Sequence, residues 1–105
     1  MANPWAGEVR LVLDGQAHEL RLTLGALAEL EADLQGETVL DLIERFEAGK
    51  FSTRDVLALI VAGLRGGGWR GVAADLVSSE IEGGLLECTK VAAQLLARAF
   101  TTQGA

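Results

Sequence analysis

The chain has 105 residues, half of them hydrophobic, which is enough apolar material for one small domain with a core and argues against disorder. Fifteen acidic residues against nine lysines and arginines give a formal charge of −6. This charge argues against non-specific binding to nucleic acid, and it is compatible with a basic protein partner or with acidic solubility alone.

Cysteine content and hydropathy further limit the class of protein and its cellular compartment. The single cysteine excludes an intramolecular disulfide and a multi-cysteine metal site, and it fits a reducing compartment. The first residues, MANPWAGE, lack the features of a secretory signal. The apolar run over residues 56–64 is shorter than the roughly 20 residues that cross a bilayer. We therefore expect a cytoplasmic protein that engages neither membrane nor nucleic acid.

Residues 8–22, EVRLVLDGQAHELRL, predict a β-hairpin. Asp14 and Gly15 form the dipeptide that two-residue turns prefer, because both central positions need a positive φ. With this turn, one face of the hairpin is apolar and the other carries pairs of opposite charge. The expected opposed pairs are Glu8 with Arg21, Val9 with Leu20, Arg10 with Glu19 and Leu11 with His18.

Helical periodicity follows the hairpin to the end of the chain. Thr23 and Thr38 stand where N-caps are expected, and Asp41 completes a capping box with Thr38. Gly36 and Gly49 stand where the first two helices should end. The sequence thus predicts a mainly α protein with an N-terminal β-hairpin, of the α+β class, forming a single domain over residues 1–105. The expected helices cover about residues 24–35, 38–48, 53–65, 71–82 and 85–101.

The third of these helices is expected to be the buried centre of the fold. Residues 56–64 include no polar side chain, so other elements must surround a helix built on them. Gly66, Gly67 and Gly68 then stop the helix. Their spacing lacks the pattern of a phosphate loop, which favours a flexible helix stop. We expect their junction with Trp69 to be the hinge of any groove for a partner.

No combination of residues predicts catalysis. Cys88 falls on the apolar stripe of the last helix, where a free cysteine acts as a small hydrophobe. His18 sits near the hairpin tip with no Asn or Asp obviously placed to orient it. We therefore expect no catalytic residue, no cofactor and no metal, and a protein that is not an enzyme.

The acidic residues of the first two helices are the one charge feature that suggests a site. Glu29 and Asp33 share a helix face, although the spacing of a calcium loop is missing. The cluster is either a solvated outer face or a docking surface for a basic partner. Trp69 is either a plug in the core or an exposed interface anchor. The candidate partner-binding residues are Trp69, Glu29, Asp33, Glu37, Asp41, Glu44 and Glu47.

The order of these motifs resembles that of a known family. An Asp-Gly hairpin precedes LTLGALAELEADLQG, ALIVAGLRGGG and LLARAF, as in small gene transfer agent family proteins that are grouped with phage tail assembly chaperones and sometimes labelled tail tube proteins. The resemblance covers residues 8–100. It implies a non-enzymatic chaperone that binds the helical, aggregation-prone tape measure protein and hands it to tail tube subunits.

The same resemblance leaves a structural alternative. A tail tube or connector subunit would use an exposed strand edge of the hairpin to pair with neighbouring subunits, as a homo-oligomer. Its partners would then be tail tube subunits instead of the tape measure protein.

Overall fold

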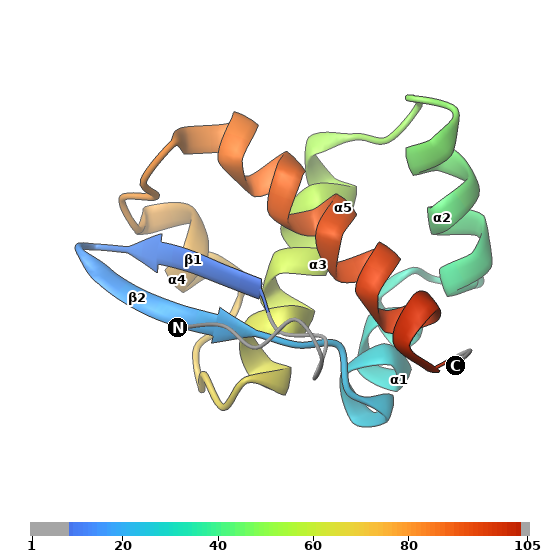
Figure 1. Ribbon diagram of the computed structural model, residues 1–105, viewed down its shortest axis with the longest axis horizontal. Helices are drawn as coiled ribbons and strands as arrows, with labels where there is room; N and C mark the ends of the chain where they lie inside the picture. Colours follow the sequence, from blue (N-terminus) through green and yellow to red (C-terminus); the bar gives the residue numbers. More distant parts are fainter. Residues whose placement is uncertain (1–8, 104–105) are drawn as a thin grey trace.

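The hairpin and the helices that follow it form the α+β fold that the sequence predicts. The computed structural model describes residues 9–103 and shows one two-stranded antiparallel sheet followed by five helices (Figure 1). The elements are β1 (Val9–Leu13), β2 (Gln16–Leu20), α1 (Leu24–Asp33), α2 (Val39–Glu47), α3 (Thr53–Gly66), α4 (Ala73–Ser78) and α5 (Gly84–Gln103).

The register of the hairpin is confirmed. Val9 pairs with Leu20, and Leu11 pairs with His18. The turn residues Asp14 and Gly15 have φ of 50° and 80°, as the turn requires. The predicted pair of Glu8 with Arg21 cannot be compared, because Glu8 lies outside the described residues. The apolar face of the hairpin is buried, through Val9, Leu11, Leu13 and Leu20.

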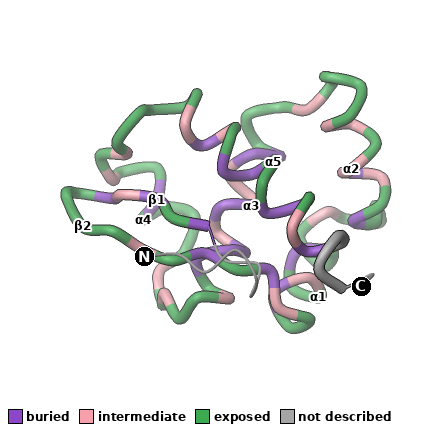
Figure 2. Tube along the Cα trace, viewed as in Figure 1, coloured by how far each residue is buried: buried purple, intermediate pink, exposed green. Residues whose placement is uncertain are grey.

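The core lies where α3 crosses the hairpin, α1 and α5. Figure 2 shows buried residues concentrated along α3 and the facing side of α5. Val56, Leu59, Ile60 and Leu64 of α3 are almost completely buried. The expectation that other elements enclose this helix is wrong on one side, however. Leu57, Ala58 and Val61 are only partly buried, because α1 and α4 stand apart on either side of them.

The fourth helix is shorter than predicted. The sequence predicts residues 71–82, whereas α4 ends at Ser78. Residues 80–82 instead run beside the end of β1, where Ile81 forms an antiparallel bridge with Leu13. The helical spacing of apolar residues continues to Ile81, but backbone hydrogen bonds to a distant strand take precedence over it.

The pairing of residues 80–82 depends on the side chain at the hairpin turn. Asp14 donates its N–H to the Glu80 carbonyl at 2.8 Å, and its Oδ1 accepts the Glu80 N–H at 2.8 Å. We expect Asp14→Ala to lower the free energy of unfolding by about 1–2 kcal/mol, because it removes an acceptor and strains a positive φ. Hydrogen exchange at the Glu80 amide should accelerate. Asp14→Asn keeps the acceptor, so it should change the free energy of unfolding and the exchange rate less. Equal effects of the two substitutions would contradict this account.

The glycines at the end of α3 are needed for close packing. Arg21 donates its N–H to the Gly63 carbonyl at 2.9 Å, which brings the end of α3 against β2. A Cβ atom at Gly66 would overlap the Arg21 carbonyl oxygen, and one at Gly67 would overlap the Glu19 carbonyl oxygen. The interpretation of this junction as a flexible hinge is therefore wrong for Gly66 and Gly67. Both are glycine because the backbone of β2 and of Arg21 directly after it occupies the space of a side chain.

Candidate partner-binding surfaces

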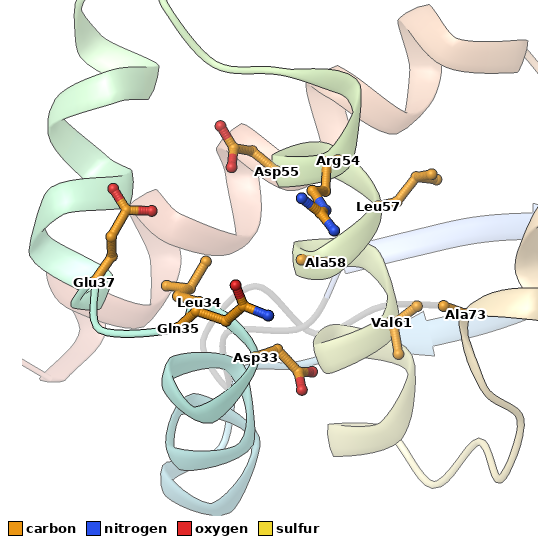
Figure 3. Close-up of a pocket in the computed structure, with 10 residues that line it drawn as sticks. All are labelled: Asp33, Leu34, Gln35, Glu37, Arg54, Asp55, Leu57, Ala58, Val61 and Ala73. Atoms are coloured by element: carbon orange, nitrogen blue, oxygen red, sulfur yellow. The ribbon is translucent and has the colours of Figure 1, made fainter.

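The partly buried side of α3 forms the floor of an open depression of about 760 Å³, which we call the α3 groove (Figure 3). Arg54, Leu57, Ala58 and Val61 follow one another at helical spacing along this floor. The end of α1 and the loop after it supply one wall, and Ala73 at the start of α4 lies on the other side. The groove is therefore an apolar helix stripe left open between two elements.

The charged side chains at and beside the groove include two that form no ion pair among the described residues and a cluster joined by hydrogen bonds. Asp33 and Arg54 are exposed and form no hydrogen bond or ion pair within residues 9–103. Arg45 instead binds two acids at once. It donates to Asp55 from Nε at 3.0 Å and from Nη2 at 2.9 Å, and to Glu37 from Nη1 at 2.6 Å. The cluster ties α2 and the loop before it to the start of α3.

Asp55 is the buried member of this cluster, with 9% of its surface exposed. Burial by itself would raise its pKa, but hydrogen bonds from Arg45 and from the N–H and hydroxyl of Ser52 outweigh burial and lower the pKa below its ordinary value. The same contact with Asp55 raises the pKa of Arg45. The ion pair is therefore a structural link between helices.

The structure does not gather the predicted acids on one surface. Glu29 forms an ion pair with Arg65 at 3.0 Å. Asp41 completes the predicted capping box, where its Oδ2 accepts the Thr38 N–H at 2.9 Å, and the hydrogen bonds from Thr38 lower its pKa. Glu29, Glu37 and Asp41 thus bind other groups of the same chain.

The remaining candidates are dispersed. Asp33 and Glu37 line the α3 groove, whereas Glu44 and Glu47 lie exposed on α2 outside it. Trp69 is partly buried against the core and its ring lies over Gly71. It lines neither the α3 groove nor a smaller depression between α4 and α5.

A second apolar depression, of about 290 Å³, was missed by the sequence reasoning. Helical spacing predicts that Val77 and Leu85 lie on the buried stripes of their helices, but they are 68% and 53% exposed. Leu86 beside them is 68% exposed. We call Val77 and Leu85, the depression that they line and the neighbouring Leu86 the α4–α5 surface.

Cys88 lies buried at this depression, and burial, with a further contribution from Glu87, raises the pKa of its thiol. The thiol is therefore protonated at neutral pH, which removes the nucleophilic form. In the part of the chain that the structure describes, no hydrogen bond joins Cys88 to His18.

Between residues 9 and 103, no group of three or more His, Cys, Asp or Glu side chains is arranged to hold a metal ion. Over the same residues, none of the helices combines the length and the apolar character that spanning a membrane requires.

The fold and these two surfaces define a small α+β protein whose open depressions expose apolar side chains, as surfaces that receive another protein's side chains do. The family model described as "Phage tail tube protein, GTA-gp10" matches residues 6–102, and the chain belongs to this family of phage-like tail proteins. The predicted relation to gene transfer agent tails is thereby confirmed. No curated protein and no solved structure gives a match.

Proposed function

We propose that this protein is a tail assembly chaperone that binds a helical segment of the tape measure protein in the cytoplasm and has no enzymatic activity. The observation that carries the proposal is the α3 groove. Leu57, Ala58 and Val61 belong to the helix that forms the centre of the core, yet the other elements between residues 9 and 103 leave them only partly covered. Helix-in-groove binding would bury this stripe against the apolar face of a partner helix.

A structural tail subunit is the second candidate, because the family description itself refers to a tail tube. A tube formed by strand pairing needs accessible strand edges. Residues 80–82 occupy part of the β1 edge, and the end of α3 lies against the β2 edge. This covering of both edges favours the chaperone over the tube.

Co-expression with the tape measure protein tests the proposal. We expect a soluble complex with the native chain and at least about a tenfold loss of complex with Ala58→Arg, which fills the groove with a long side chain. Ala93→Arg, at an exposed position of α5, is the matched control and should leave the complex intact. Circular dichroism of both variants checks the fold.

Two results would count against this assignment. A tape measure protein that is equally soluble alone removes the need for a chaperone. A complex that survives Ala58→Arg places the contact outside the α3 groove. Mass spectrometry of purified particles then separates the two candidate functions, because a tube subunit is abundant in the particle and a chaperone is absent from it.

A further inference from the structure

The α4–α5 surface exposes more large apolar side chains than any other part of the described chain. Of the six large hydrophobic residues that are exposed within residues 9–99, four fall in residues 72–86. The exposed Val77 and Leu85 line the depression together with Leu57, Leu76, Ile81 and Cys88, and the exposed Leu86 follows Leu85 in the chain. A ligand that enters it therefore meets almost only aliphatic groups.

The charges of the segment that forms this surface are mostly acidic. Residues 71–89 contain four acids, Asp75, Glu80, Glu82 and Glu87, whereas the exposed bases Arg70 and Lys90 stand on either side of the segment. Asp75 accepts the Val72 N–H, but the carboxylates of the three glutamates bind no group within the described part of the chain. The segment around the apolar depression thus carries more acids than bases.

The fold brings these parts together at one end of the molecule. α4 and the beginning of α5 both lie toward the hairpin tip, where residues 80–82 join them (Figure 1). The acids of residues 80–82 are held there by backbone hydrogen bonds to β1. Apolar and acidic groups therefore share one surface in the free protein, without any rearrangement.

We infer that the α4–α5 surface binds an amphipathic helix of another protein whose apolar stripe is flanked by lysine or arginine. Such a helix places aliphatic side chains in the depression and its cations against Glu80, Glu82 and Glu87. A second copy of this chain docked face to face would oppose acid to acid, and an anionic lipid surface would be repelled. This depression shares Leu57 with the α3 groove but is otherwise lined by different residues, so the inference goes beyond the proposed function.

A pair of designed peptides tests the inference. One is an 18-residue helix with a leucine stripe flanked by lysines, and the other carries glutamates in place of the lysines. Fluorescence anisotropy with the full chain should show binding of the lysine peptide that weakens as salt rises from low to moderate ionic strength. The glutamate peptide should bind at least about tenfold more weakly.

Variants of the protein locate the contact. We expect the triple substitution Val77→Ser, Leu85→Ser and Leu86→Ser to weaken binding of the lysine peptide at least about tenfold. The triple substitution Glu80→Gln, Glu82→Gln and Glu87→Gln should weaken binding and reduce its salt dependence while keeping the apolar contact. Leu24→Ser with Leu40→Ser is the matched control, because these leucines are 76% and 64% exposed on the other helices, and it should not change binding.

The inference is overturned if the control variant weakens binding as much as the serine triple variant, or if the glutamate peptide binds equally well. It is also overturned if the glutamine variant binds with unchanged affinity and salt dependence. Co-expression with the tape measure protein separates this result from the proposed function, since Ala58→Arg tests the α3 groove and the serine triple variant tests the α4–α5 surface.

Discussion

Gly66→Ala is expected to lower the free energy of unfolding by about 2–4 kcal/mol, although alanine is normally the better helix former. Gly66 is the last residue of α3, and the Arg21 carbonyl oxygen of the strand exit lies where a Cβ atom would be. The obstructing atom belongs to the backbone, so no side-chain rotation can relieve the overlap. Either α3 or β2 must move, and the core contacts between them are then lost.

Gly25→Ala is the matched control for this prediction. Gly25 also lies in a helix, but the nearest atom to a Cβ built there is the Thr23 Oγ1 at 3.9 Å. Alanine should raise stability there by about 0.5 kcal/mol, because it reduces the freedom of the unfolded chain. Urea denaturation measures the free energy of unfolding of both variants. Changes of the same sign and size would show that the approach of α3 to β2 is not what requires glycine at position 66.

Arg45→Met is expected to lower the free energy of unfolding by about 2–4 kcal/mol at neutral pH. The substitution keeps an apolar stem but removes both hydrogen bonds to Asp55, which leaves a carboxylate in a site that is only 9% exposed. Arg65→Met is the control, because its pair with Glu29 is exposed and should contribute less than about 1 kcal/mol.

The pH dependence of Arg45→Met distinguishes loss of the ion pair from loss of packing. The pKa of Asp55 is lowered in the folded protein, so its contribution to stability is present above the unfolded pKa of about 4 and is lost as the pH falls through the lower, folded value. The stability difference between wild type and Arg45→Met should therefore narrow below about pH 4. Urea denaturation from pH 3 to 7 measures it, and a constant difference would assign the effect to packing instead.

Features that depend on neighbouring residues in the chain were predictable. The Asp14-Gly15 turn implies the register of the hairpin, because the number of turn residues determines which strand residues oppose each other. Thr23 and Thr38 cap α1 and α2 as expected, since a capping hydroxyl bonds to a backbone N–H three residues away. These contacts form within one segment, so the sequence pattern is sufficient to identify them.

The candidate site was less predictable, because it depends on which groups meet across the fold. The acids of α1, of α2 and of the loop between them appear alike in the sequence, yet Glu29 and Glu37 have arginine partners, whereas Glu44 has none within residues 9–103. Val77 and Leu85 also fit the apolar spacing of their helices, yet both are exposed, and no local pattern indicates this.

The sequence by itself determined the hairpin, the capped helices and the α+β class, because turn residues, caps and apolar periodicity act over a few neighbouring positions. Only the tertiary structure decided that one stripe of α3 stays partly open and that residues 80–82 pair with β1 instead of continuing α4. It also decided that Gly66 and Gly67 allow close packing. Each of these depends on backbone or side-chain groups brought together from distant parts of the chain, and on the space left between them.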